Sequence, residues 1–133
     1  MEYIVGLVLA LAVSVFATRV GLDRDRAFYP TVMIVIALIY VLYAVIGGSS
    51  RALAIESVIS LGFIFAATIG FKRNLWIVAG ALAGHGIYDF FHDYLVSNPG
   101  VPPWWAMFCL TYDIAAAGYL AWLLRSSKID KAN

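Results

Sequence analysis

The stretch LWIVAGALAGHGIYDFFHDYL, residues 75–95, has the length and apolar character of one membrane-spanning helix. Such a helix needs about 20 predominantly apolar residues. The turn sequence SNPGVPP follows at residues 97–103, and a second apolar stretch runs from about Trp104 to Leu124. Because so short a connection joins neighbouring helix ends, we expect these two spans to be antiparallel partners.

Three further apolar stretches precede this pair, and the composition of the whole chain agrees with them. The 133 residues are 63% hydrophobic and 13% charged, whereas a soluble domain carries roughly 25% charged residues. We therefore predict an all-α fold, a polytopic membrane helix bundle of about five transmembrane helices that forms a single domain over residues 1–133. The predicted spans are residues 3–18, 29–46, 52–71, 75–95 and 104–124.

The distribution of Lys and Arg predicts the orientation of the bundle, because cytoplasmic loops are enriched in positive residues. Arg51 is the one basic residue between the second and third spans, on one side of the predicted membrane. With five spans, this asymmetry places the N-terminus outside and the C-terminus in the cytoplasm, for a multi-pass protein of the cell inner (plasma) membrane. The opposite side carries Arg19, Arg24, Arg26, Lys72, Arg73, Arg125, Lys128 and Lys131.

Ionisable side chains within spans are energetically costly and usually mark function, and the fourth span concentrates them. His85, Asp89 and His92 are spaced i, i+4 and i+7, so they form one stripe on a helix. Two imidazoles and a carboxylate are suitable ligands for a divalent transition metal. The same groups suit a proton relay equally well, since His titrates near neutrality.

Two neighbouring spans carry carboxylates at compatible depths. At 1.5 Å per residue, Asp89 lies roughly 9 Å and Asp113 roughly 13 Å below the outer end of its span, and Glu56 lies roughly 6 Å down. We therefore predict an outward-facing polar site in the outer half of the bilayer, which binds a divalent metal or a small polar ligand. The predicted metal ligands are His85, Asp89, His92 and Asp113, and the further ligand-binding residues are Glu56, Tyr88, Trp104, Trp105 and Tyr112.

Two other functions are compatible with these residues. In a membrane-embedded enzyme acting on a lipid or isoprenoid, Trp104, Trp105 and Phe108 would form an aromatic wall, and His85, Asp89 and Asp113 are the catalytic candidates. In an accessory or structural subunit, the same charged groups would bridge helices or contact a partner membrane subunit. The sequence does not decide whether the protein is an enzyme. A homo-oligomer could also complete a path across the membrane.

The remaining composition excludes some classes of function. The basic residues form no patch with interleaved aromatics, so we expect no nucleic-acid partner. Cys109 is the one cysteine, which excludes an intrachain disulfide, and we expect it to be a small buried hydrophobe. Small residues let neighbouring helices approach closely, so we expect tight packing of the fourth and fifth spans. The small residues are Gly80, Gly84 and Gly86 in the fourth span and Ala115, Ala116, Ala117, Gly118 and Ala121 in the fifth.

Three segments resemble a family of small uncharacterised bacterial integral membrane proteins. They are DRAFYPT at residues 25–31, HGIYDFFHDYLVSNPGVPPWW at residues 85–105 and FCLTYD at residues 108–113. The resemblance covers most of the chain after the first span, and its pattern reads HGxYDxxH, NPGVPxWW and FCxxYD. It implies a bacterial inner-membrane location and singles out the residues discussed above, but it implies no particular reaction.

Overall fold

The computed structural model describes residues 1–132, and these form five helices with no strand in a sheet. The predicted all-α fold is confirmed, and each helix begins and ends within two residues of its predicted span. The helices are α1 (Glu2–Val20), α2 (Phe28–Ile46), α3 (Ser50–Lys72), α4 (Leu75–Leu95) and α5 (Trp105–Arg125).

Local hydrogen bonding explains where several of these helices begin and end. The side chain of Ser49 accepts a bond from the Ala52 amide at the start of α3, and Asn74 accepts one from the Trp76 amide at the start of α4. Such caps satisfy amides that have no partner within the helix. Helix α1 ends at Gly21, whose φ of 86° is the left-handed conformation that glycine adopts easily.

Four of the five helices, α1, α2, α3 and α5, are long and apolar enough to cross a membrane. Their outward faces carry large apolar side chains; Val58 is 71% exposed and Phe65 is 68% exposed on α3. So much exposed apolar surface is unusual for a soluble protein. Helix α4 has a sufficient length of 21 residues, about 31 Å, but its polar residues lower its apolar character. Its crossing of a membrane stays a prediction.

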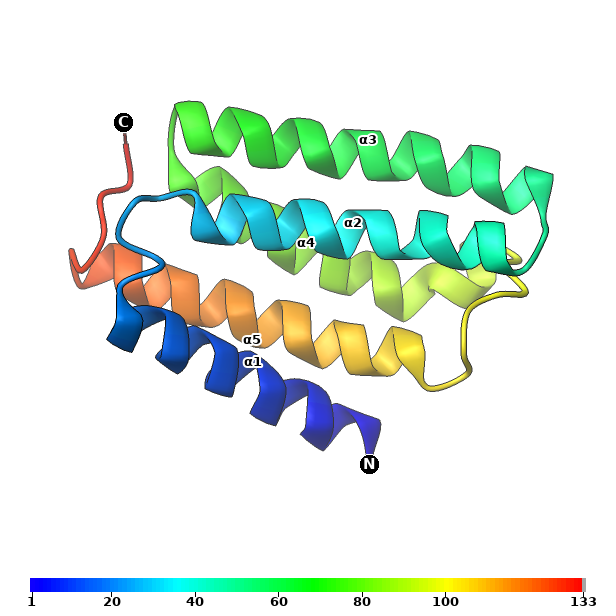
Figure 1. Cartoon of the computed structure of the whole chain (residues 1–133), viewed down its shortest axis with the longest axis horizontal. Coiled ribbons are helices and arrows are strands. Elements are labelled where there is room, and N and C mark those ends of the chain that lie inside the picture. Colours follow the sequence, from blue (N-terminus) through cyan, green and yellow to red (C-terminus); the bar gives the residue numbers. More distant parts are fainter. Residues whose placement is uncertain (133) are drawn as a thin grey trace.

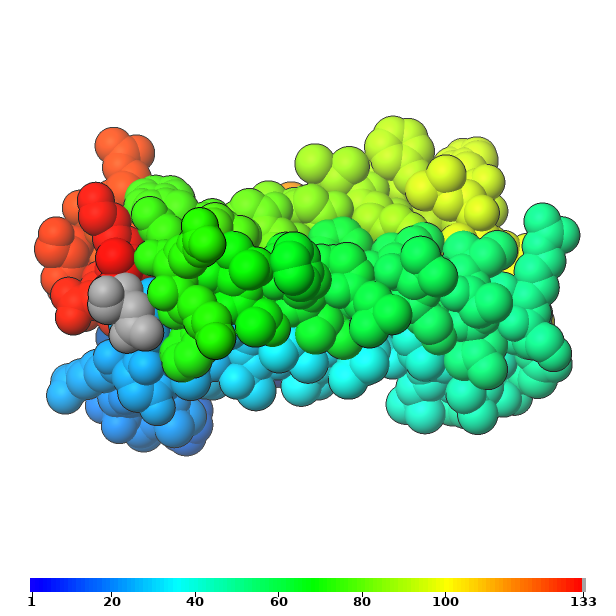
Figure 2. Space-filling model, turned by 90° about the horizontal axis from the view of Figure 1, so that it is seen from above, coloured from blue at the N-terminus to red at the C-terminus, as the bar shows by residue number. Residues whose placement is uncertain are grey.

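Helix α4 occupies the centre of the bundle, where it packs against α5, α3 and α2, while α1 packs on α5 (Figure 1). Helix α3 runs along the whole face of the molecule that is seen from above (Figure 2). A largely aliphatic core lies between α2, α4 and α5 and includes Met33, Leu82 and Leu120, each fully buried. The residues of α4 that point inward are therefore enclosed by three other helices.

The close approach of α4 and α5 depends on Gly86. A Cβ atom at this position would lie 3.1 Å from Ile114 and 3.4 Å from the Cβ of Asp113. By contrast, no atom lies within 4 Å of where a Cβ would stand at Gly80 or Gly118. The expectation that small residues let α4 and α5 approach closely is therefore confirmed at Gly86 and wrong at Gly80 and Gly118, because the latter two do not meet a neighbouring helix.

The connections between helices fall into two groups at opposite ends of the bundle. The α1–α2 and α3–α4 connections lie at one end with the C-terminal tail, and the α2–α3 and α4–α5 connections lie at the other end with the N-terminus (Figure 1). The tail is attached to its end of the bundle, since the Leu75 amide donates to the Lys131 carbonyl at 2.7 Å. The eight basic residues named above therefore gather at one end.

Candidate functional site

The inward face of α4 carries the polar stripe that the sequence predicts. His85, Asp89 and His92 are 1%, 0% and 0% exposed. Residues four and seven positions apart lie on the same side of a helix, and this side faces α2, α3 and α5. Each of these polar groups is therefore withdrawn from solvent and depends on partners from other helices.

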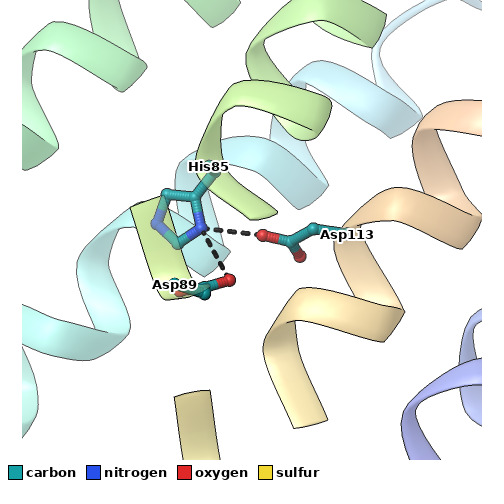
Figure 3. Close-up of side chains that lie close together, drawn as sticks. All are labelled: His85, Asp89 and Asp113. Atoms are coloured by element: carbon teal, nitrogen blue, oxygen red, sulfur yellow. Dashed lines mark hydrogen bonds and ion pairs between the residues drawn. The ribbon is translucent and has the colours of Figure 1, made fainter. Parts of the chain in front are cut away.

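His85, Asp89 and Asp113 form a compact cluster, which we call the His–Asp cluster. The Nδ1 atom of His85 lies 2.7 Å from Oδ2 of Asp113 on α5 and 3.4 Å from Oδ2 of Asp89 on its own helix (Figure 3). One ligand atom from each residue can be chosen so that all three lie within 4.8 Å of one another. The structure thus brings together three of the four residues predicted as metal ligands.

The carboxylates of the His–Asp cluster are incompletely satisfied. Tyr40 on α2 donates a hydrogen bond from its hydroxyl to Oδ1 of Asp89 at 2.7 Å. Within residues 1–132, Oδ2 of Asp89 and Oδ1 of Asp113 are buried and have no hydrogen-bond partner. Buried polar atoms are nearly always hydrogen-bonded, so these two oxygens indicate that a proton or a cation belongs in the cluster.

His92 does not join this cluster, although it shares the face of α4. Its Nε2 atom lies 2.6 Å from Oε1 of Glu56 on α3. Tyr88 donates to Oε2 of Glu56 at 2.7 Å, and Asn98 donates to Oε1 of Glu56 at 3.1 Å. We call Glu56, His92, Tyr88 and Asn98 the Glu56 cluster. It lies closer to the α4–α5 connection, because His92 is nearer than Asp89 to the end of α4.

Tyr40 was not among the residues singled out from the sequence, yet it contacts both clusters. It lies in an otherwise apolar span, and nothing in the sequence distinguishes its hydroxyl from that of an ordinary core tyrosine. Asn98 belongs to the predicted turn, but its bonds to Glu56 and to the Tyr40 carbonyl could not be read from spacing. The Tyr40–Asp89 and Asn98–Glu56 hydrogen bonds each join residues more than 40 positions apart in the chain.

Most aromatic residues in the first half of α5 line an apolar groove rather than the two polar clusters. Trp105, Phe108 and Tyr112 line an apolar groove of about 320 Å³ between α1, α2 and α5, together with Cys109. Cys109 is buried, as expected. Trp104 remains half exposed at the start of α5. The Tyr112 hydroxyl makes none of the side-chain hydrogen bonds found in residues 1–132.

A scan against protein-family models and searches of curated proteins and of solved structures found no match to this chain. The fold and the site by themselves define a five-helix bundle that is largely apolar on its outer surface and holds a buried His–Asp cluster. This combination is compatible with a membrane protein that binds a metal ion.

Proposed function

We propose that this chain is a multi-pass integral membrane protein that binds one divalent transition metal ion through His85, Asp89 and Asp113. The observation that carries the proposal is the pair of buried carboxylate oxygens, Oδ2 of Asp89 and Oδ1 of Asp113, that accept no hydrogen bond from the described residues. Removing a charged carboxylate from water costs several kcal/mol unless a counter-charge is present. A divalent cation at this point would compensate both carboxylates at once.

The donor set and its spacing fit such an ion. Zinc binds His nitrogen and carboxylate oxygen at about 2.0–2.2 Å, usually with tetrahedral geometry, so neighbouring ligand atoms lie about 3.4 Å apart. The distance of 3.4 Å between His85 Nδ1 and Asp89 Oδ2 matches this spacing, and the distance of 2.7 Å to Asp113 Oδ2 would have to widen. Three protein ligands leave a fourth position for water or another ligand. The Tyr40 hydroxyl would hold the Asp89 carboxylate in place, as outer-shell partners of metal ligands do.

The membrane topology is part of the same proposal. Eight basic residues at one end of the bundle support a cytoplasmic location for that end, by the positive-inside rule. The N-terminus and the two connections at the other end would then lie outside. The His–Asp cluster would occupy the outer half of the membrane, and the Glu56 cluster would lie between it and the outer surface.

The test of metal binding is metal analysis of the whole chain purified in detergent under metal-replete conditions. We expect about one equivalent of metal in the unmodified protein, and we expect His85→Gln to abolish it. His92→Gln is the matched control, because it makes the same change on the same face of α4 but outside the cluster. Absence of stoichiometric metal in the folded, unmodified protein would overturn the metal assignment.

A second function, an enzyme acting on a lipid or isoprenoid, is favoured by the groove beside the fifth helix. Trp105, Phe108 and Tyr112 line this groove, and Cys109, which also lines it, lies one helical turn from Asp113. A hydrocarbon chain could therefore lie close to acid–base groups without passing through the polar core. Mass spectrometry of lipids that copurify with the protein tests this function; we expect Phe108→Ala to lose a lipid that the unmodified protein retains.

A further inference from the structure

A polar pocket lies at the basic end of the bundle, far along the helices from both polar clusters. Its volume is about 230 Å³, and it is formed where the α1–α2 connection meets the end of α5 and the tail. Three charged residues line it: Asp23, Arg24 and Lys128. The proposed metal site leaves this pocket without a role.

Asp23 is a buried carboxylate that faces this pocket without a cationic partner. It is 2% exposed, and its Oδ2 accepts a hydrogen bond from the Thr18 hydroxyl at 2.6 Å. The Thr18 hydroxyl also lies 3.0 Å from the hydroxyl of Tyr119. Within residues 1–132, no Lys, Arg or His nitrogen lies within 4.0 Å of the Asp23 carboxylate. Buried charges are usually paired, so this carboxylate is available to a cation from outside the chain.

The two cationic side chains of the pocket are also without carboxylate partners in the part of the chain that the structure describes. Both Arg24 and Lys128 are exposed, and neither forms an ion pair there. The ammonium group of Lys128 lies over the ring of Trp122, 5.4 Å from its centroid. These groups are therefore available to bind an anion at the mouth of the pocket.

Arg26, which belongs to the same connection, has a structural role instead. It is buried, and its guanidinium donates to the carbonyls of Asp130 and Lys131 at 2.9 Å and 3.2 Å. It thereby ties the tail to the α1–α2 connection, and it does not line the pocket. The charges that remain for a ligand are one negative group inside the pocket and two positive groups around it.

We infer that this pocket binds the head group of an ethanolamine phospholipid, with the ammonium at Asp23 and the phosphate at Arg24 and Lys128. A primary ammonium has three N–H donors, which suit a buried carboxylate, and Arg and Lys are the residues that bind phosphate. The inference rests on the membrane-spanning part of the proposed function and is independent of the metal site. The pocket would lie at the cytoplasmic interface, where lipid head groups are found.

Native mass spectrometry of the whole chain in detergent tests the inference. The probes are phosphatidylethanolamine, phosphatidylcholine and phosphatidylglycerol with identical acyl chains. We expect phosphatidylethanolamine to bind about tenfold more tightly than phosphatidylcholine, whose quaternary ammonium has no N–H donor. Asp23→Asn keeps an acceptor for Thr18 and should abolish this preference. Lys128→Ala should weaken binding of both phosphatidylethanolamine and phosphatidylglycerol.

Two matched controls lie on the same end of the bundle but outside the pocket. Asp130→Asn and Lys72→Ala change the same charges at exposed positions and should leave the lipid preference intact. Equal binding of the ethanolamine and choline lipids, or an unchanged preference in Asp23→Asn, would overturn the inference. Binding of free phosphoethanolamine as tightly as of the lipid would overturn the lipid assignment. Metal analysis of the same samples separates these outcomes from failure of the metal site.

Discussion

The phenol ring of Tyr40 lies flat against the imidazole of His92, with ring centroids 4.0 Å apart and planes inclined by 9°. The hydroxyl of the same tyrosine donates to Asp89 at 2.7 Å. One side chain from α2 therefore packs on the Glu56 cluster with its ring and completes the His–Asp cluster with its hydroxyl. In the described part of the chain, no hydrogen bond joins the side chains of one cluster to those of the other, but Tyr40 contacts both clusters.

Replacing Tyr40 with Phe should separate these two contributions. The ring stacking on His92 is kept, whereas Asp89 loses its one hydrogen-bond donor and becomes a less satisfied buried carboxylate. We expect a loss of about 1–3 kcal/mol in the stability of the metal-free protein, measured by thermal unfolding in detergent. Tyr94→Phe is the control, because Tyr94 is 86% exposed on α4. Equal unfolding temperatures for the two variants would contradict the assigned role of the hydroxyl.

Metal removal should destabilise the folded bundle. A ligand that binds only the native state at 100 times its dissociation constant stabilises it by about 2.7 kcal/mol, and treatment with a chelator removes this contribution. We expect the melting temperature to fall on chelation and to recover when the metal is restored. Asp113→Asn should show no such dependence, because it lacks one anionic ligand. If neither the chelator nor added metal changes the melting temperature of the unmodified protein, the result would count against the metal site.

We expect the Glu56 cluster to stabilise the fold without taking part in metal binding. Glu56→Gln removes the charge that faces His92 but retains a side chain of similar size, so we expect a loss of about 1–3 kcal/mol in stability. Metal stoichiometry should be unchanged, since Glu56 contacts none of the three proposed ligands. Asp130→Asn is the control, because that exposed side chain lies in the tail at the opposite end of the bundle. Loss of metal in Glu56→Gln would show that the two clusters act as one site.

Gly86→Ala should loosen the contact that brings Asp113 to His85. Its Cβ would lie 3.1 Å from Ile114, and overpacking of this kind costs about 1–3 kcal/mol. Gly80→Ala makes the same change on the same helix in open space and should be neutral or slightly stabilising. Thermal unfolding and metal content of the two variants provide the comparison. Equal stability of both would show that α4 and α5 can move apart without cost.

The predicted orientation can be tested with single cysteines. In a Cys109→Ala background, Ser50→Cys and Ser126→Cys place one thiol at each end of the bundle, both at exposed positions. We expect a membrane-impermeant maleimide to label intact cells at residue 50 and to label residue 126 only after lysis. The reverse pattern would invert the topology, and equal labelling at both ends would contradict an odd number of spans.

The sequence by itself determined the helical architecture of this protein. Apolar stretches of about 20 residues separated by short polar connections are typical of a series of helices, each of which satisfies its own backbone hydrogen bonds. The ends of each helix could therefore be predicted to within two residues. The period of the α-helix also determined that His85, Asp89 and His92 share one face. These features are local, because they depend on residues close together in the chain.

Only the tertiary structure decided which partners these residues meet. The stripe on α4 is divided, with His85 and Asp89 directed to Asp113 and His92 directed to Glu56. This division depends on the rotation of α3 and α5 about their own axes and on the close approach of α4 to α5 at Gly86. Residue spacing along the chain specifies neither of these. The same is true of Tyr40 on α2, whose hydroxyl reaches Asp89 because the bundle places two distant helices in contact.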